Sequence, residues 1–304
     1  MNLSPAVAKL GGFGLALVVA FAAAYGIGQA VGPVEDASPE AAAPAEDGGT
    51  GSAEHGHGGG ADAETPAEGG HAEVVPAGLQ VSAEGYTLDV VDPHGFAFRI
   101  LDDHGTPVTR FTPNHDKLMH LIVARRDLSG FRHVHPQMSA DGTWRIPLDL
   151  RAAGDHRVFA DFVPAGREEG LTLGVDVPVP GAFTPVPLPA PALTAIVDGY
   201  RVTLSGHLDA GTTSKLTLTV DRGGVPVTDL QPYLGAYGHL VALRQGDLAY
   251  LHVHPDEDAG PGPDIGFGAE VPSVGTYRLY LDFKHGDVVR TAEFTVVAES
   301  HEEK

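Results

Sequence analysis

A stretch of 35 residues occurs twice in this chain, and the repeat constrains the fold more than any other feature. Residues 102–136 align without a gap to residues 221–255, and 13 of the 35 positions are identical. The motifs Pro-Val-Thr, His-Leu and His-Val-His-Pro recur in the same order at a constant offset of 119 residues. An internal duplication of this kind indicates two copies of one domain.

The pattern of residue types in the repeated regions predicts an all-β fold. Short runs rich in Val, Thr, Leu, Phe and Tyr alternate with turn pairs such as Asp-Gly and Gly-Gly, and no sustained helical period follows residue 31. We expect two tandem Ig-like or cupredoxin-like β-sandwiches, residues 79–183 and 192–298, with about seven strands each. Residues 178–191 contain six prolines, so we expect a stiff connection, assigned to residues 184–191; residues 299–304 form a tail.

The N-terminal segment is an uncharged apolar run. Leu10 to Val31 covers 22 residues, which is long enough to cross a bilayer as a helix. Lys9 precedes the run, and Glu35 and Asp36 follow it, so the positive-inside rule predicts that everything after the run lies outside the cytoplasm. Residues 1–31 are thus predicted to be a single-pass anchor in the cell membrane. The alternative is a signal peptide that is cleaved, leaving a secreted protein.

Composition excludes several kinds of partner and site. Residues 32–78 are low-complexity and acidic, which predicts a disordered tether. The whole chain carries 40 acidic against 19 basic residues, a formal charge of −21, and this balance argues against nucleic acid. It has no cysteine, so disulfides and thiolate metal sites are excluded. A negative field favours cations, metal ions included.

Three histidines in each repeat are the candidate functional residues. Residues two apart in a strand face the same side, so His133 and His135 project together. The turn of Arg125 to Gly130 predicts a hairpin that brings His120 opposite one of them, with Cβ atoms about 4.5–5.5 Å apart. Three imidazoles on one face predict a metal site; the alternative is a set of partly buried histidines satisfied by structural partners. The second repeat supplies the matching set: His239, His252 and His254.

Two methionines lie beside the first histidine set and bear on the identity of the metal. Thioether ligands select copper, whereas imidazoles alone also suit zinc. Met138 follows His135 by three residues and is predicted to be a ligand, with packing as the alternative. Met119 precedes His120 and should face the opposite side, where it fills the core. We therefore expect copper, with zinc as the alternative.

Two further matched pairs accompany the histidines. Asp161 and Asp282 each precede a phenylalanine in an apolar strand, and each is a candidate metal ligand or a partner that orients an imidazole. A solvent-facing position is the alternative. Arg125 and Arg244 lie next to the hairpin turn, where an ion pair or packing of the stem is expected.

These motifs resemble a known group of proteins. The elements Gly-Xaa-Pro-Val-Thr, His-Leu, His-Val-His-Pro and Tyr-Arg-Leu-Tyr-Leu-Asp-Phe look like those of exported, often membrane-anchored bacterial β-sandwich proteins associated with heavy-metal handling. The resemblance covers both repeats and implies binding of copper or a related metal at the two histidine sets. Periplasmic copper chaperones, however, carry a His-Xaa-Met element, and this chain has His-Val-His instead.

The sequence predicts a membrane-tethered metal-binding protein that buffers, detoxifies or delivers copper or zinc, with a metal-transfer protein as the candidate partner for delivery. A structural or adhesive Ig-like module of the cell envelope is the alternative. A cupin-like metalloenzyme is a third and more distant one, because the Met138 position lacks the glutamate that Glu257 supplies in the second repeat. No nucleophile elbow, phosphate loop or carboxylate dyad is present, so no enzymatic activity is predicted.

Overall fold

The protein is described by a computed structural model that covers residues 75–93, 95–148, 150, 152–251, 253–256 and 260–300. These residues belong to one compact unit, residues 70–304. Their regular secondary structure is entirely β-strand, which confirms the all-β prediction. Within this part of the chain no helix is long and apolar enough to span a membrane. The predicted anchor, Leu10 to Val31, lies outside the described residues.

The first repeat folds into a sandwich of two antiparallel sheets, called sandwich 1. The outer sheet has the order β1-β2-β3-β8-β7, with strands Ser82–Ala83, Tyr86–Asp92, Ala97–Leu101, Trp144–Arg145 and Gln137–Met138. The inner sheet has the order β10-β9-β5-β6, with strands Leu171–Val179, Gly154–Pro164, His120–Arg125 and Arg132–Val134. A short strand β4, Phe111–Thr112, also pairs with β9. The core between the sheets is aromatic, and Phe98, Trp144 and Phe162 are fully buried in it.

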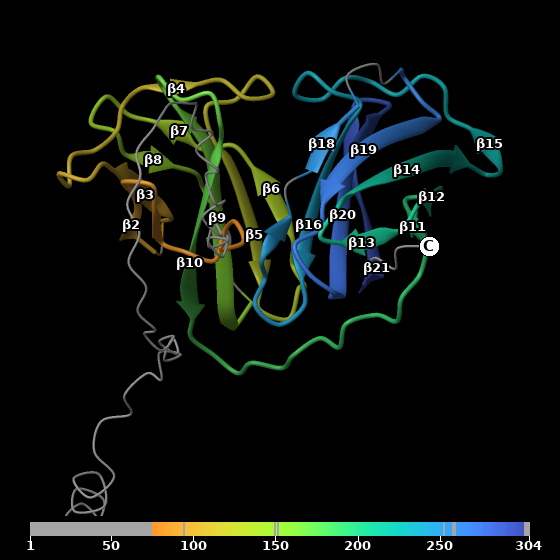
Figure 1. Ribbon diagram of the computed structural model, residues 1–304, viewed down its shortest axis with the longest axis horizontal. Coiled ribbons are helices and arrows are strands. Elements are labelled where there is room, and N and C mark those ends of the chain that lie inside the picture. The colour runs from red at the N-terminus through yellow and green to blue at the C-terminus, as the bar shows by residue number, and fades with distance from the viewer. Residues whose placement is uncertain are drawn as a thin grey trace, which may run out of the picture. The chain divides into compact units, whose positions relative to one another are not determined.

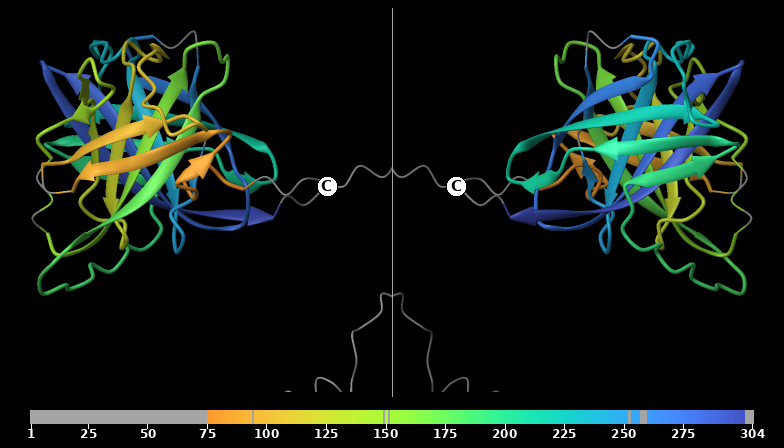
Figure 2. Two further views of the ribbon diagram at one scale, coloured as in Figure 1. Left: turned by 90° about the vertical axis from the view of Figure 1, so that its left-hand side faces the viewer. Right: turned by 90° about the vertical axis from the view of Figure 1, so that its right-hand side faces the viewer.

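The second repeat forms sandwich 2 from two sheets as well, which are antiparallel except for one parallel pair at the edge of the inner sheet. Its outer sheet has the order β11-β12-β14-β19-β18, with strands Thr194–Val197, Tyr200–Ser205, Thr213–Arg222, Asp264–Glu270 and Val253–Pro255; β15, Val225–Pro226, pairs with β14. Its inner sheet has the order β13-β21-β20-β16-β17, with strands Leu208–Ala210, Val288–Ser300, Gly275–His285, Gly238–Arg244 and Tyr250–Leu251. Figure 2 shows the two outer sheets from opposite sides.

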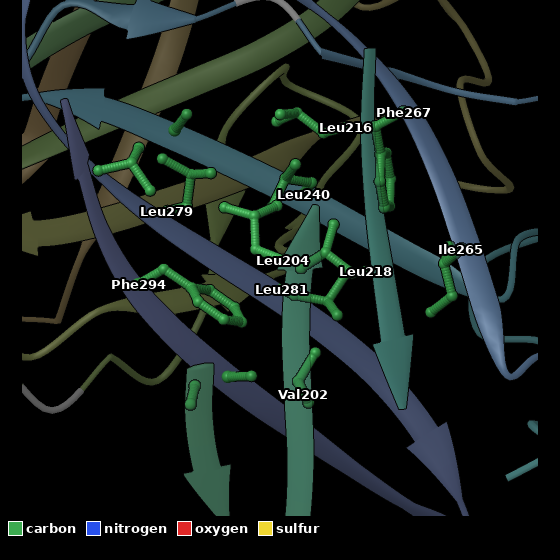
Figure 3. Packing of buried hydrophobic residues seen from close by; sticks show 14 of the residues in the cluster. Val202, Leu204, Leu216, Leu218, Leu240, Ile265, Phe267, Leu279, Leu281 and Phe294 are labelled. Atoms are coloured by element: carbon green, nitrogen blue, oxygen red, sulfur yellow. The ribbon is translucent and has the colours of Figure 1, made fainter. Parts of the chain in front are cut away.

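Leucine and phenylalanine side chains from both sheets fill the core of sandwich 2. Figure 3 shows Leu204 and Leu218 of the outer sheet meeting Leu281 and Phe294 of the inner sheet. The alternation along β12 and β14 places every second residue in this core, as a period of two requires. The rest of each outer sheet is exposed or partly exposed.

The described strands outnumber the seven expected for each sandwich. Sandwich 1 has ten and sandwich 2 has eleven in the described residues, because several edges consist of strands of only two or three residues. β10 ends at Val179 and β11 begins at Thr194, so the proline-rich segment connects the two sandwiches. β21 continues to Ser300, two residues past the predicted end of the second domain.

The central strands β5 and β16 of the inner sheets differ from the outer strands because they are buried on both faces. In β5, Leu121 points into the core of sandwich 1, whereas Ile122 joins a separate buried cluster. In β16, Leu240 and Val241 divide in the same way. Figure 1 shows β5 and β6 of sandwich 1 facing β16 and β20 of sandwich 2. The separate cluster therefore fills the space between the two inner sheets.

We call this set the interface cluster; its buried members are Ile122, Ala124, Leu128, Phe159, Val241, Leu243, Leu248 and Tyr280. Each member from one repeat has its counterpart from the other. Ile122 corresponds to Val241, for example, and Phe159, two residues before Asp161, corresponds to Tyr280, two residues before Asp282. The same patch on both partners is the property of a two-fold interface. The two sandwiches thus meet as the two halves of a pseudo-symmetric pair.

Candidate metal centre

The hairpin of β5 and β6 brings the three histidines of the first repeat together. Its register pairs Leu121 with Val134 and Ile122 with His133. Continuing this register by one residue places His120 opposite His135. The three histidines therefore share the face that Ile122 occupies, which looks toward sandwich 2. The prediction that the hairpin gathers His120, His133 and His135 on one face is confirmed by the geometry.

Three imidazole nitrogens converge to within 4.8 Å of one another. Nδ1 of His120 lies 3.0 Å from Nε2 of His133 and 3.2 Å from Nε2 of His135. Two nitrogens that bind one ion at 2.0–2.1 Å with a tetrahedral angle are about 3.3 Å apart. The spacing of the three nitrogens is close to that of a ligand set.

The tautomer of His120 is fixed by a backbone carbonyl. Nε2 of His120 donates to the oxygen of Asn114 at 2.9 Å, and a carbonyl oxygen can only accept. Asn114 and Lys117 form two mutual backbone hydrogen bonds, so the turn that presents this carbonyl is itself held in place. Nδ1 of His120, the nitrogen that faces the other two histidines, consequently carries the lone pair.

The tautomer of His133 is fixed by a carboxylate from the other sandwich. Nδ1 of His133 donates to Oδ2 of Asp282 at 3.0 Å, and the two side chains are 5% and 6% exposed. Oδ1 of Asp282 accepts from the hydroxyl of Thr291 at 2.6 Å. The proton on Nδ1 leaves Nε2 of His133 as a lone pair. A carboxylate behind an imidazole is the usual second-shell partner of a metal-bound histidine.

Two lone pairs therefore face each other at 3.0 Å in a buried place, and only a cation between them makes that contact favourable. A proton is disfavoured there. Burial, with the neighbouring histidines, lowers the pKa of His120 to about 4 and that of His135 to about 3, although the Asn114 carbonyl acts in the opposite direction on His120. His120 and His135 are therefore neutral at pH 7, the form in which an imidazole binds metal ions.

The described part of the second histidine set repeats this arrangement. Nε2 of His239 donates to the oxygen of Tyr233 at 2.7 Å, so Nδ1 again carries the lone pair. Burial, only partly offset by the Tyr233 carbonyl, lowers the pKa of His239 to about 4. The ring of His239 lies 6.5 Å from that of His120 and 6.0 Å from that of His133. His252 and the side chain of His254 lie outside the described residues, so the second ligand set stays a prediction.

The two methionines have different outcomes. Met119 is 1% exposed and packs in the core of sandwich 1, which confirms that it faces away from His120. Met138 lies in β7, where it pairs with Trp144 and packs against the same core. β7 belongs to the outer sheet, whereas the histidines lie on the inner one. We therefore leave Met138 out of the proposed ligand set.

The structure shows contacts for both matched pairs of polar residues, the two aspartates and the two arginines. Asp282 orients His133 rather than facing solvent, and Asp161 accepts from Thr172 as Asp282 does from Thr291. Arg125 and Arg244 form the predicted ion pairs with Asp127 and Asp247 in the hairpin turns. Sequence reasoning missed the carbonyls of Asn114 and Tyr233. Each of these residues follows a proline that is matched between the repeats. A backbone acceptor, however, cannot be recognised from the type of its side chain.

A cavity of about 620 Å³ opens beside the triad, between the two sandwiches. Its polar lining includes Asn114, His115, His120, His133, Asp161 and His239. An ion can therefore reach the buried nitrogens through a polar space to which both sandwiches contribute.

A known family model matches both repeats. The model described as "Domain of unknown function (DUF8832)" matches residues 72–179 and 195–300, which together exceed half of the chain. The chain belongs to this family. The two matched stretches of the DUF8832 family correspond to sandwiches 1 and 2. No curated protein matches the chain.

Solved structures with similar folds are distant. The bacterial integrin-binding protein invasin is 15% identical, with a TM-score of 0.22, over 74% of this chain and 38% of invasin. The adhesin InvE of Yersinia pseudotuberculosis is 11% identical, with a TM-score of 0.22, over 72% of this chain and 60% of InvE. Domains 4 and 5 of the S-layer protein SbsC are 12% identical, with a TM-score of 0.21, over 73% of this chain and 98% of those domains. The chain thus spans less than two thirds of the invasin and InvE chains.

Proposed function

We propose that this protein binds a late first-row transition metal ion through His120, His133 and His135, and that it does so outside the cytoplasm, tethered to the membrane by its N-terminal segment. Its role is to buffer the ion or to deliver it to a transfer protein. The repeat predicts a second ion at His239, His252 and His254. We propose binding rather than catalysis, because the polar groups around the triad hold the histidine rings in position.

One observation carries the proposal. Nδ1 of His120 and Nε2 of His133 lie 3.0 Å apart, and the partners on the far side of each ring assign both nitrogens as lone pairs. A structural role would instead pair each nitrogen with a donor. The depressed pKa values of His120 and His135 disfavour a proton as the shared cation and so support a metal ion.

The donor set favours Cu(II), with Zn(II) as the alternative. All three proposed donors are imidazole nitrogens, which suit copper, zinc and nickel, and Cu(II) binds most tightly to a given nitrogen site. Without Met138 the set contains no thioether, so it gives no preference for Cu(I). We propose that Cu(II) outcompetes Zn(II) at equal concentration.

An adhesive or structural module of the cell envelope is the second candidate function. The similar solved structures include an integrin-binding protein, an adhesin and an S-layer protein. Their TM-scores of 0.21 to 0.22 supply no argument about function, whereas the buried triad is a feature that adhesion does not require. A metal-free module would use the histidines for packing alone.

Metal uptake by the full-length chain tests the proposal. The protein, stripped of metal, is loaded with Cu(II) or Zn(II) and examined by mass spectrometry under non-denaturing conditions. We expect stoichiometric uptake, and His135→Ala should weaken the first site by more than about 100-fold, since loss of a mere second-shell partner already costs about 10–100-fold.

His104→Ala is the matched control. His104 belongs to the same repeat, but its side chain is 83% exposed and its neighbour is Asp103, so uptake should equal that of the wild type. Absence of stoichiometric binding, or equal loss in both variants, would refute the metal proposal and leave the adhesive module.

A further inference from the structure

The carboxylate that orients His133 comes from the opposite sandwich. Asp282 lies in β20, where its residue pairs with His239 of β16, and it is 4% exposed. Its Oδ2 atom nevertheless accepts from His133 across the interface. The ligands of the first site thus come from sandwich 1, whereas one of the groups that fix their orientation comes from sandwich 2.

The hairpin that carries the triad has further contacts to the same strand. Tyr280, two residues before Asp282, stacks on Phe131 with ring centres 3.9 Å apart and planes at 7°. Its hydroxyl donates to the oxygen of Leu128 at 2.5 Å. Since β6 is the edge strand of its sheet, β20 provides the surface against which this strand and its histidines are held.

The corresponding acid, Asp161, lines the cavity between the two sandwiches together with Tyr250. Burial, with the charge of Asp161, raises the pKa of Tyr250 well above its usual value. Tyr250 belongs to sandwich 2 and packs near Phe159 of sandwich 1, with ring centres 5.6 Å apart. Both acids of the matched pair therefore lie at the interface between the sandwiches.

From these contacts we infer that Asp282 is a positioning residue for the metal site of sandwich 1, and that metal binding and the docking of the two sandwiches are thermodynamically linked. The inference rests on the proposed function and adds a regulatory property to it. An ion held by the triad favours the docked arrangement, in which Asp282 supports His133. Undocking leaves His133 without its carboxylate and weakens the site.

Linkage of this kind is reciprocal. The factor by which docking strengthens metal binding equals the factor by which the metal strengthens docking. A metal ion bound only by sandwich 1 must therefore stabilise β20 of sandwich 2. A partner that separates the sandwiches would release the ion, which gives a delivery protein a means of unloading.

Affinity is the first test, measured by calorimetric titration of the full-length chain with Zn(II). The background carries His254→Ala, which removes the predicted second site. We expect Asp282→Asn, an isosteric change, to weaken binding by about 10–100-fold. Asp264→Asn is the control, because Asp264 is an exposed residue of the same sandwich whose side chain accepts from the hydroxyl of Thr219; the affinity of this variant for Zn(II) should be unchanged.

Amide hydrogen exchange is the second test and needs no change at Asp282. In the same background, Zn(II) should slow exchange in residues 275–285 at least threefold, and the slowing should vanish in His135→Ala. Unchanged exchange in β20, with tight binding in Asp282→Asn, would overturn the linkage and leave the metal site intact. No Zn(II) or Cu(II) uptake by any form would overturn the linkage and the proposed function together.

Discussion

His120 and His239 occupy matching positions in the two sandwiches, and each donates from Nε2 to the carbonyl of the residue six positions earlier. That residue is Asn114 in one sandwich and Tyr233 in the other. The chemistry is the same although the side chains have nothing in common, because only the backbone oxygen is used. The two repeats therefore keep the same residue where a side chain makes the contact, and they differ in residue type where only a backbone oxygen is used.

The aromatic contacts across the interface show a second difference. Phe131 and Tyr280 are stacked at 3.9 Å, whereas the corresponding pair, Tyr250 and Phe159, is tilted by 51° at 5.6 Å. Tyr280 has a hydroxyl bonded to Leu128, and Phe159 has no such group. The two-fold relation is thus approximate, and sandwich 2 holds the hairpin of sandwich 1 more closely than the reverse.

The largest expected effect comes from breaking the interface that both sandwiches share. Leu243 is fully buried in the interface cluster, and its counterpart is the much smaller Ala124. Leu243→Ala should lower the free energy of unfolding by about 2–5 kcal/mol, because it leaves a cavity between two sheets. Urea denaturation measures it. Val225→Ala, at a residue 66% exposed, is the control; a loss of similar size in both would contradict a buried interface.

A smaller effect distinguishes the two hairpin turns. Asp127 accepts hydrogen bonds from Arg125, Ser129 and the Val186 amide, and its side chain is 9% exposed. Asp247 pairs with Arg244 but is 40% exposed. Asp127→Asn should cost about 1–3 kcal/mol, and Asp247→Asn about 0–1 kcal/mol, both by urea denaturation at pH 7.

The pH dependence of this difference follows from the carboxyl pKa. Although burial acts to raise it, the hydrogen bonds from Arg125 and Ser129 hold the pKa of Asp127 well below its usual range. A lowered folded-state pKa contributes stability above the ordinary value of about 4, and that contribution is lost as the pH falls below it. The gap between wild type and Asp127→Asn should therefore shrink below about pH 4. A gap that is constant with pH would show that the charge has no role.

Another small effect tests the hydroxyl that distinguishes Tyr280 from Phe159. Tyr280→Phe keeps the ring that stacks on Phe131 and removes the donor to Leu128. We expect a loss of about 0.5–1.5 kcal/mol in the free energy of unfolding, measured by thermal and urea denaturation. No loss at all would mean that the stacked ring alone accounts for the closer contact.

The sequence alone was sufficient for the β-sandwiches, the hairpin and the shared face of His120, His133 and His135. Each follows from a local rule: a period of two, a turn, and one register. The same rule placed Met119 in the core. Met138 shows where local rules stop, because closeness in sequence to His135 predicted a ligand, whereas pairing with Trp144 carries it into the outer sheet.

What covers the histidine face could not be predicted. A strand pattern tells which residues share a side but not what that side meets. The available signal was β5 itself, which is apolar on both faces and buried throughout, as in a sheet covered twice. The role of Asp282 required the docked arrangement, since 149 residues separate it from His133.

The self-matching interface cluster has a consequence for how such a chain is assembled. A domain whose buried patch fits a second copy of itself pairs by a two-fold axis, and separate copies would do so only above their dissociation constant. Joining the copies through the proline-rich segment replaces that requirement with an effective concentration that the length and stiffness of the segment set. The pair then forms at any dilution and always contains one first and one second sandwich. The two faces of the interface can therefore differ in sequence, as Phe159 and Tyr280 do.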